Sequence, residues 1–367
     1  MKTLIIFAAI FSVVVFITCK KGTSKSDDTQ TEVTLTDKIL TPNLNYPWEI
    51  LWGPDSKLWI TERDGKISRV DPATGAVTPL LTIGEVVSQG EGGLLGMVLH
   101  PDFSTTPEVF VAYNYLKSGT YTKKVVKFTY NGTTLINPQV LLDNIPASSI
   151  HNGTRLAISP DKKLYITSGD ASVSSRAQDK SNFAGKIQRI NLDGSIPADN
   201  PIAGSTLWSF GHRNPQGLVF VNNRLYSSEH GSGTDDEINI IQKGRNFGWP
   251  NVEGFCNTGD ERAFCTTNNV VEPIFAWSPT IAPSGIDYYN NDAIPQWKNS
   301  LLLAILKDSE LLQIKLNTAG DKVEVVNTFY KNTYGRMRDV AISPDGKVYI
   351  ITSNGGNDKI IEVSKGQ

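Results

Sequence analysis

A repeated pattern of two apolar segments joined by a short polar turn is the feature that most constrains the fold of this chain. Four clear copies are ILWGPDSKLWITER, LAISPDKKLYITSGD, LVFVNNRLYSSEHG and VAISPDGKVYIITSN. LGMVLHPDF followed by VFVAYNY is a further copy, and LLLAILKDSELLQIKL is a looser one. The apolar segments are typical of β-strands, and Pro-Asp or Asn in the turns favours hairpin connections.

The spacing of these copies indicates the architecture. Six copies are spread along the chain at roughly 55 residues each, and repeats of about 40–50 residues with four strands are typical of propellers. No helical periodicity is sustained anywhere along the sequence. We therefore predict an all-β fold, a single six-bladed β-propeller of four-stranded antiparallel blades, over residues 37–365.

Composition excludes some partners. The 367 residues are 39% apolar and 20% charged with a formal net charge of −2, which is ordinary for a globular protein. A charge so close to zero gives no electrostatic basis for nucleic-acid binding, so we expect no nucleic-acid partner.

The N-terminal segment has the composition of an export signal. Lys2 precedes an apolar run at residues 4–17, which is too short to span a membrane, and Cys19 follows it. Cys19 resembles the cysteine of a bacterial lipobox, which is lipidated and becomes the mature N-terminus, although two residues before it are not the usual small ones. We expect a signal peptide at residues 1–19, a flexible tether at 20–36, and export to the periplasm or anchoring as an outer-membrane lipoprotein. The membrane would be contacted only through this lipid anchor.

Two cysteines remain, Cys256 and Cys265, in a stretch without strand character. A local disulfide is the first expectation for an exported protein, and two free thiols are the alternative. No other cysteine or histidine lies close by in sequence to complete a metal site.

The chain has four histidines. His100 lies inside a repeat turn and is expected to be structural. His151, His212 and His230 occupy comparable places in successive repeats, where a histidine is either a packing residue or part of a shared site.

The segment SSEHGSGTDDEINII at residues 227–241 is the second polar cluster. Gly231 and Gly233 permit close approach of the backbone to a ligand. Carbonyls and carboxylates together suit calcium, and an acidic surface loop is the alternative.

Four cations lie near the ends of expected strands: Arg213, Lys307, Arg336 and Arg338. The two arginines in YGRMRDV alternate, so they point to the same side of a strand. Solvated edge arginines are one interpretation. In a propeller, however, such cations can converge on the axis, where they would suit a ligand with several carboxylates.

Seven motifs in the same order along residues 44–362 resemble one family. They are GEGGLLGMVLHPDF, HNGTRLAISPD, GKIQRINLDGSIPADNP, GHRNPQGLVF, EHGSGTDDEINIIQKGRNFGWP, SPTIAPSG and RMRDV. Together they resemble the soluble sugar dehydrogenases that depend on pyrroloquinoline quinone, the glucose/sorbosone dehydrogenase family, and within it the aldose sugar dehydrogenase branch. That family folds as a six-bladed propeller.

The resemblance implies roles for particular residues. His151 matches the general base, and Asp170 matches the acid that orients it. The residues that would line the cofactor are Glu91, Arg213, Asn214, Thr280, Lys307, Arg336 and Arg338. The carbonyls of Gly231 and Ser232 would hold a calcium ion at the cofactor, and Glu237 with the carbonyl of Phe247 would hold a second, structural calcium ion. By this reasoning His212 is a packing or capping residue.

Glu91 departs from the family, which usually has glutamine at this position. A carboxylate there adds negative charge beside an anionic cofactor. We expect this to affect substrate choice, pH optimum or cofactor binding. The long insertions of the glucose enzyme are absent, which favours a broad range of aldoses and a monomer.

The implied activity is oxidation of aldose sugars at the anomeric carbon to lactones, with electrons passed to an external acceptor. His151 would take the proton of the anomeric hydroxyl while hydride passes to the quinone. Two alternatives remain open: a non-catalytic propeller that binds sugars or partners, and a calcium-dependent lactonase-type hydrolase.

Overall fold

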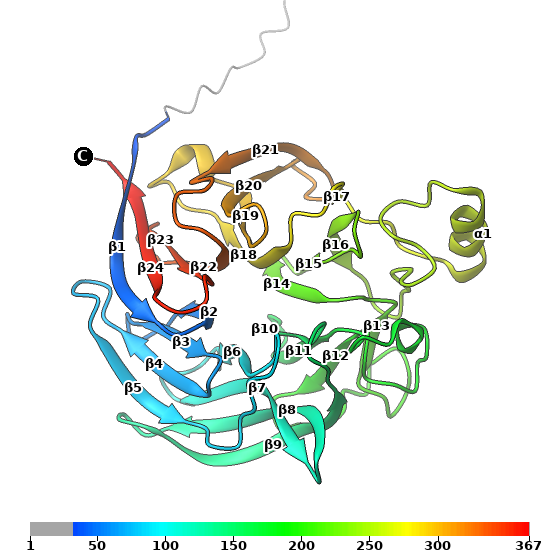
Figure 1. Cartoon of the computed structure of the whole chain (residues 1–367), viewed down its shortest axis with the longest axis horizontal. Helices are drawn as coiled ribbons and strands as arrows, with labels where there is room; N and C mark the ends of the chain where they lie inside the picture. Colours follow the sequence, from blue (N-terminus) through cyan, green and yellow to red (C-terminus); the bar gives the residue numbers. More distant parts are fainter. Residues whose placement is uncertain (1–31, 367) are drawn as a thin grey trace, which may run out of the picture. The chain divides into compact units, whose positions relative to one another are not determined.

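The computed structural model describes residues 32–366, which form six four-stranded antiparallel sheets (Figure 1). Five sheets are built from four consecutive strands, and the sixth joins both ends of the described chain. This confirms the prediction of an all-β six-bladed propeller with four-stranded blades. The predicted signal peptide, and the predicted tether up to residue 31, lie outside the described residues.

Each blade runs from an innermost strand at the axis to an outermost strand at the rim. Blade 1 consists of β2 Pro47–Trp52, β3 Leu58–Glu62, β4 Lys66–Val70 and β5 Val77–Thr82. Blade 2 consists of β6 Leu94–Leu99, β7 Glu108–Lys117, β8 Thr120–Tyr130 and β9 Leu135–Pro146. Blade 3 consists of β10 Gly153–Ile158, β11 Lys163–Ser168, β12 Lys186–Asn191 and β13 Leu207–Phe210. Blade 4 consists of β14 Pro215–Val221, β15 Arg224–Glu229, β16 Asp236–Ile241 and β17 Phe275–Trp277. Blade 5 consists of β18 Pro283–Tyr289, β19 Ser300–Ile305, β20 Glu310–Leu316 and β21 Val323–Phe329. Blade 6 consists of β22 Met337–Ile342, β23 Val348–Thr352, β24 Asp358–Lys365 and, outermost, β1 Leu35–Leu44.

The six innermost strands form a closed ring. β2 contacts β6, β6 contacts β10, and the series continues through β14, β18 and β22 back to β2. Strand β1 closes the ring by pairing with β24, from Leu35 opposite Lys365 to Leu44 opposite Asp358. It begins slightly before residue 37, the expected start of the propeller. Blade 6 therefore depends on both ends of the described chain.

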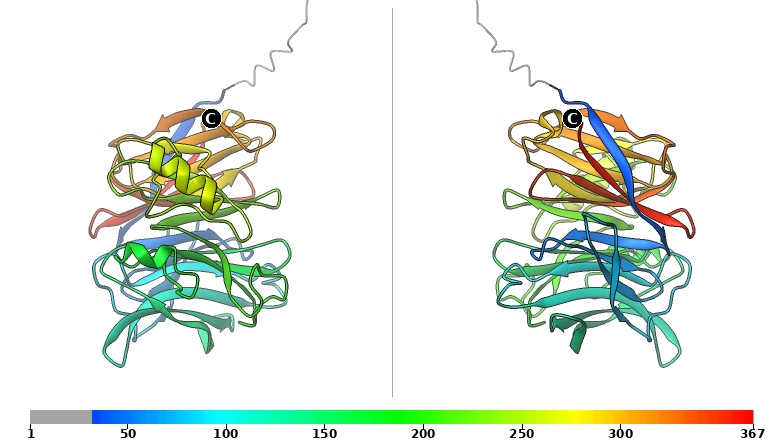
Figure 2. Two further views of the ribbon diagram at one scale, coloured as in Figure 1. Left: turned by 90° about the vertical axis from the view of Figure 1, so that its right-hand side faces the viewer. Right: turned by 90° about the vertical axis from the view of Figure 1, so that its left-hand side faces the viewer.

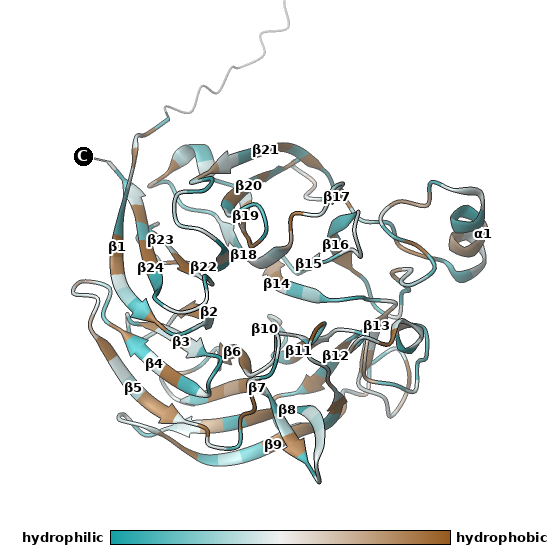
Figure 3. Cartoon of the chain, in the orientation of Figure 1, coloured by the Kyte–Doolittle hydropathy of each residue, from teal (hydrophilic) through white to brown (hydrophobic). Residues whose placement is uncertain are grey.

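The hydrophobic core lies between facing blades. The strands alternate apolar with polar residues, drawn brown and teal in Figure 3, so that each blade buries an apolar face against its neighbours. Between blades 1 and 2, for example, Trp59, Leu94 and Val111 are fully buried in one cluster. Burial of each such side chain is worth about 1.5–3 kcal/mol before entropy is counted. The apolar repeats of the sequence are thus the packing surfaces of the blades.

A β-bulge lies near the N-terminal end of every innermost strand. The pairing register shifts after Pro47, Leu94, Gly153, Pro215, Pro283 and Met337. A bulge changes the direction in which the adjacent side chains point and often lies beside a functional site. The six bulges are all on one face of the ring, because the six strands begin there.

A ten-residue helix, α1 (Gly259–Asn268), lies at the outer side of the ring in the long connection between β16 and β17 (Figure 2). The sequence analysis expects no helix, because this segment has no apolar face, and indeed none of its residues is buried. Its N-terminus is instead fixed by a capping box between Thr258 and Glu261. The short helices η1 (Ser174–Ala177) and η2 (Pro295–Trp297) complete the described secondary structure.

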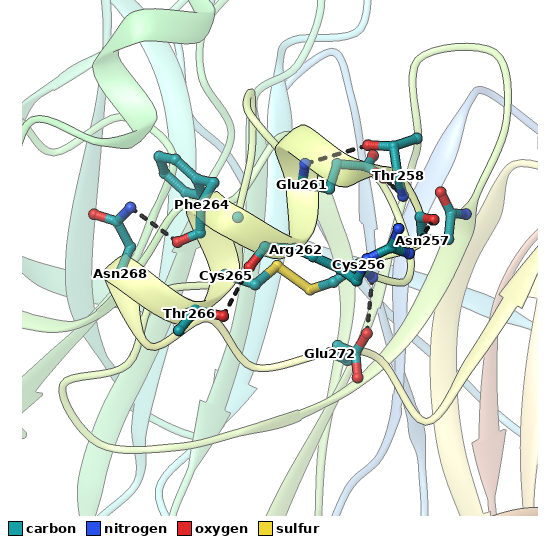
Figure 4. Close-up of a disulfide and its surroundings, with 12 residues drawn as sticks. Cys256, Asn257, Thr258, Glu261, Arg262, Phe264, Cys265, Thr266, Asn268 and Glu272 are labelled. Atoms are coloured by element: carbon teal, nitrogen blue, oxygen red, sulfur yellow. Dashed lines mark hydrogen bonds between the residues drawn. A yellow bond between two sulfur atoms is a disulfide. The ribbon is translucent and has the colours of Figure 1, made fainter.

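A disulfide joins Cys256, just before α1, to Cys265 inside it (Figure 4). This confirms the first of the two alternatives left open by the sequence. The disulfide and the capping box act on the same turn of the chain, which explains how a helix without a buried face keeps its place.

Candidate active site

The candidate residues gather on one face because the innermost strands all begin there. His151 lies just before β10, Asn214 just before β14, and Arg336 just before β22. The second strand of each blade runs back to the same face, so Asp170 after β11 and Lys307 after β19 also lie there. Residues spread over most of the sequence are thus brought to one mouth of the ring.

A cavity of about 480 Å³ opens on this face. Three of the predicted cofactor residues line it, namely Glu91, Arg336 and Arg338. The other lining residues are Tyr46, Arg63, Gln216, His230, Ala282, Leu306, Ser353, Asn354 and Gly355. The alternation of Arg336 and Arg338 correctly predicts that both face one space. A cavity of this size and polarity suits a small polar ligand.

His151 and Asp170 form a hydrogen-bonded pair beside this cavity. His151 Nδ1 lies 2.9 Å from Asp170 Oδ1, and Asp170 is only 1% exposed. A carboxylate acceptor keeps the proton on Nδ1 and leaves Nε2 free to accept another. The backbone supports the pair: His151 has φ of 57°, and a side chain at Gly169 would come within 2.2 Å of the His151 carbonyl oxygen. The structure thus places the predicted base and its orienting acid in contact.

Glu91 connects His151 to the cavity. Its carboxylate accepts the backbone N–H of His151 at 3.0 Å, and its own N–H donates to the Ser149 carbonyl at 2.6 Å. Arg63 supports this loop by donating from Nε to the Gly92 carbonyl at 3.0 Å. The residue that departs from the family is therefore part of the framework of the base.

Arg213 and Asn214 are adjacent in sequence but differ in environment. Arg213 donates weakly to the His230 carbonyl at 3.3 Å, and Asn214 accepts the Gly153 N–H at 3.0 Å. Among the described residues, the buried Nε of Arg213 and the buried Nδ2 of Asn214 have no hydrogen-bond partner. Buried donors without an acceptor are costly unless a ligand supplies one.

Arg338 is the most buried of the cations, with 9% exposure. It donates to Gln216 Oε1 at 2.6 Å and Ser284 Oγ at 3.2 Å, while its buried Nε lacks a partner within residues 32–366. Burial is the main cause of a lowered Arg338 pKa. A buried guanidinium held only by neutral groups is prepared for an anion.

Lys307 and Thr280 form a separate hydrogen-bonded pair beside the cavity. The Lys307 ammonium donates to the carbonyl and the hydroxyl of Thr280, at 2.7 and 3.0 Å. Neither residue lines the 480 Å³ cavity, although the neighbouring Leu306 and Ala282 do. The structure therefore places this pair next to the cavity and not inside it.

A second, much smaller space of about 10 Å³ adjoins the first, since His230 lines both. The residues predicted to bind metal are found here: Gly231, Glu237 and Phe247 line it together with the carboxylates of Glu229, Asp235 and Glu253. Ser232 does not line it, but its hydroxyl donates to Glu253 at 2.6 Å. The predicted metal ligands are thus brought close together.

Glu237 is a buried carboxylate with unusual electrostatics. Burial, together with the negative charge of Glu229, raises its pKa to about 8. It accepts hydrogen bonds from the Gly254 N–H at 2.8 Å and from Asn239 at 2.7 Å. Asn239 Oδ1 is buried and has no partner within the described residues. Carboxylates near one another and an unused amide oxygen suit a hard cation.

The remaining histidines behave as the sequence analysis expects. His212 is fully buried, lies 2.9 Å from both Ser209 Oγ and Glu229 Oε2, and stacks on Phe247. His100 accepts the N–H of Asp102 in its turn. Both have structural roles.

His230, which the sequence left as either a packing residue or part of a shared site, lines both cavities. Burial lowers its pKa to about 3, so it stays neutral.

Two further residues of the site were missed by the sequence analysis. Lys123 is 1% exposed, donates to the Asn152 carbonyl beside His151, and has its pKa lowered to about 7 by burial. Trp249 donates from its indole N–H to Asp170 at 2.9 Å. Nothing local in the sequence distinguishes Lys123 or Trp249, because their importance comes from partners far away in the chain.

The mouth of the propeller holds a histidine–carboxylate pair and buried guanidinium nitrogens without a partner within residues 32–366, an arrangement that suits an anionic ligand. The comparison with known proteins identifies the class of protein. Residues 44–362 match the family described as Glucose / Sorbosone dehydrogenase, and the chain belongs to this family. This confirms the family predicted from the motifs and the prediction of a sugar dehydrogenase, an oxidoreductase.

Three relatives illustrate the similarity. The chain is 34% identical to quinoprotein glucose dehydrogenase B of Acinetobacter calcoaceticus, over 87% of this chain and 86% of the relative. It is 32% identical to aldose sugar dehydrogenase YliI of Escherichia coli, over 90% and 93% of the two chains. The structure of the PQQ-bound aldose sugar dehydrogenase of Streptomyces coelicolor superimposes with a TM-score of 0.78 at 33% identity, over 90% of this chain and 98% of the other.

Proposed function

We propose that this protein oxidises aldose sugars at the anomeric carbon to lactones, using pyrroloquinoline quinone and calcium and passing electrons to an external acceptor. The observation that carries the proposal is the His151–Asp170 pair beside a cavity lined by Arg338, whose buried Nε has no hydrogen-bond partner within residues 32–366. Relatives named as quinoprotein and PQQ-bound sugar dehydrogenases support it.

The residues present fit the cofactor. Pyrroloquinoline quinone carries three carboxylates, and the unpartnered Nε atoms of Arg213 and Arg338 are donors for such groups. Asn214 offers a further unused donor, and Arg336 adds charge at the cavity wall. Lys307, which is hydrogen-bonded to Thr280, would contact the cofactor from beside the cavity. When bound, the quinone would supply the two-electron acceptor that no amino-acid side chain provides.

Calcium is the second part of the proposal. Glu237 and the Phe247 carbonyl are the proposed ligands of a structural ion, and the carbonyls of Gly231 and Ser232 would bind the ion at the cofactor. Within residues 32–366 no group of three or more His, Cys, Asp or Glu side chains is arranged to hold a metal, so backbone carbonyls would have to complete both sites. The ion at the cofactor would act as a Lewis acid.

Side chains of this protein would accept the proton that the sugar loses. His151, with Nδ1 bound to Asp170, presents Nε2 to accept the proton of the anomeric hydroxyl. Asp170 then stabilises the resulting imidazolium. Glu91 holds the backbone of His151 and brings a carboxylate to the sugar side of the cavity, where it would influence which aldose is accepted.

Partners and location are part of the proposal. We infer a monomer that meets sugar and electron acceptor outside the cytoplasm, held at the membrane only by lipid on Cys19. Within residues 32–366, no helix is long and apolar enough to cross a membrane.

Reconstitution tests the proposal. Purified apoprotein with added quinone and calcium should reduce a dye in the presence of several aldoses, and His151→Ala should lower turnover by roughly 10²–10⁴-fold while the melting temperature stays unchanged. Lactone hydrolysis without dye reduction would indicate a hydrolase. Sugar binding without any turnover would indicate a binding protein, and either result would overturn the proposal.

A further inference from the structure

The indole of Trp249 lies between two parts of the site that the family motifs treat separately. Its Nε1–H donates to Asp170 Oδ2 at 2.9 Å, although the two residues are 79 positions apart. The face of its ring lies under the guanidinium of Arg213, with the Arg213 Cζ 5.3 Å from the ring centroid. One side chain thus touches the acid of the proton-transfer pair and a cation of the cofactor site.

The backbone fixes the position of this ring. The Trp249 N–H donates to the Gly211 carbonyl at 3.0 Å, and the Trp249 carbonyl accepts from Gln178 at 2.6 Å. Gly248 has φ of 96°, and a side chain there would come within 2.8 Å of Val252. Because the backbone is held on both sides of Trp249, its Cα cannot shift without disturbing these bonds, and the contacts to Asp170 and Arg213 orient the ring.

The Asp170 carboxylate needs this donor. Its Oδ1 is used twice, by His151 Nδ1 at 2.9 Å and by the Ser172 N–H at 2.8 Å. Its Oδ2 has Trp249 as the one hydrogen-bond donor found among the described residues. A carboxylate that is 1% exposed cannot replace a lost donor freely with water, so loss of the indole N–H would free it to rotate away from His151.

We propose that Trp249 is a positioning residue of the sugar oxidation, which orients Asp170 and His151 through its N–H and supports Arg213 through its ring. The resemblance to the family implied no such role for Trp249. The expected effect on kcat rests on the proposed function. The hydrogen bond from Trp249 to Asp170 can be tested in the apoprotein, without any cofactor.

The indole N–H also has an electrostatic effect. It stabilises negative charge on Asp170 and holds the carboxylate so that Oδ1 faces His151 Nδ1. The other charged or titratable groups around the pair are Glu91 at the His151 backbone, Lys123 beneath Asp170, and Arg213 and His230 on the cofactor side. None of these is altered when only Trp249 is changed.

Two substitutions separate the two contacts. Trp249→Phe keeps a ring beneath Arg213 and removes the N–H. In the reconstituted holoenzyme we expect kcat to fall roughly tenfold, with the sugar KM and the dissociation constant of the quinone unchanged, and the acid limb of the pH profile to shift. Trp249→Leu removes the ring as well and should in addition weaken quinone binding to the apoprotein.

A double-mutant cycle shows whether the effect passes through Asp170. In an Asp170→Asn background, W249F should cause little further loss, because the carboxylate that the indole orients is already gone. An equal loss in both backgrounds would mean that Trp249 acts elsewhere and would overturn the proposal, as would an unchanged kcat and pH profile in W249F.

The apoprotein provides the readout that does not depend on activity. NMR of the His151 Nδ1–H signal, assigned from H151Q, should show that this signal moves in W249F relative to the wild type, because its acceptor Asp170 has lost a donor. Wild-type protein without any dehydrogenase activity would refute the proposed function and leave this measurement intact. An unmoved His151 Nδ1–H signal refutes the role of Trp249. If W249F does not fold, the wild-type indole N–H resonance that changes in D170N must also change in H151Q, and a resonance that stays still overturns the proposal.

Discussion

At the scale of single residues, the His151–Asp170 pair depends on a buried carboxylate whose hydrogen-bond donors all come from named residues of the chain. Asp170 receives three donors, from His151, Ser172 and Trp249, and is almost completely buried. Such a carboxylate can orient an imidazole because it has little freedom of its own. The proton-transfer pair is therefore preorganised before any ligand arrives.

Lys123 provides a test of burial at this scale. Burial lowers its pKa from 10.5 to about 7, so between these values the unfolded chain binds more protons than the folded one. Stability should therefore rise with pH from about 7 to 10.5, by at most about 1.4 kcal/mol per pH unit for this one group. Urea unfolding of wild type and Lys123→Met across this range measures the effect. The variant should lack this part of the slope, and parallel curves would contradict the prediction.

Sequence patterns predict some of these residues and not others. His151 stands in a motif that resembles a known family, and the resemblance implies Asp170 as its partner, so their pairing was expected. The role of Trp249 was not, although NFGWP is part of such a motif, because its partner Asp170 is 79 residues away and nothing near Trp249 signals that contact. Likewise, the sequence showed no reason to separate Lys123 from any other lysine of a strand.

At the scale of elements, the repeated turns have the same structure as well as the same sequence. In the segments 53–57, 159–163 and 343–347, the first N–H donates to the fifth carbonyl and the fourth N–H to the first carbonyl. The fourth residue has a positive φ each time, namely Ser56, Lys162 and Gly346. These turns follow the innermost strands and so lie on the face opposite the candidate site. The repeated segments of the sequence therefore predict the strands and turns of the propeller. The candidate functional residues lie in segments that differ from one repeat to the next.

The turns predict opposite effects of two substitutions. Ser56 is exposed with φ of 58°, a conformation that costs a residue with a side chain about 1–2 kcal/mol, so Ser56→Gly should raise stability by up to about 1 kcal/mol. Gly346→Ala should lower it, since φ is 82° and the added carbon would lie 2.5 Å from Asn291 Oδ1. Thermal unfolding measures both, and the idea of a shared turn fails if Ser56→Gly is destabilising.

The helix α1 allows a second test at this scale. Because it buries no residue, replacing Cys256 and Cys265 together by serine should loosen it locally and leave the melting temperature of the propeller nearly unchanged. Hydrogen exchange should rise across residues 258–269 and not in the blades, with Thr258→Ala as a milder control for the cap. A large loss of global stability would show that the disulfide supports more than α1.

At the scale of the whole propeller, closure is what creates the site. Glu91, His151, Arg213, Lys307 and Arg338 come from five different parts of the chain and reach one face of the ring only because the six innermost strands begin there. The number of blades followed from counting repeats. The cavity walls did not, because they depend on bulges and on contacts across the ring that no single repeat contains.

The central claim is that this face binds pyrroloquinoline quinone and uses it to oxidise sugars. The most direct measurement is an anaerobic titration of calcium-loaded apoprotein with the quinone, followed by addition of an aldose while the cofactor absorbance is recorded. We predict saturation at one quinone per chain, reduction of the bound cofactor by the sugar, and binding without rapid reduction in His151→Ala. Failure of the quinone to bind, or a bound quinone that no aldose reduces, would contradict the account.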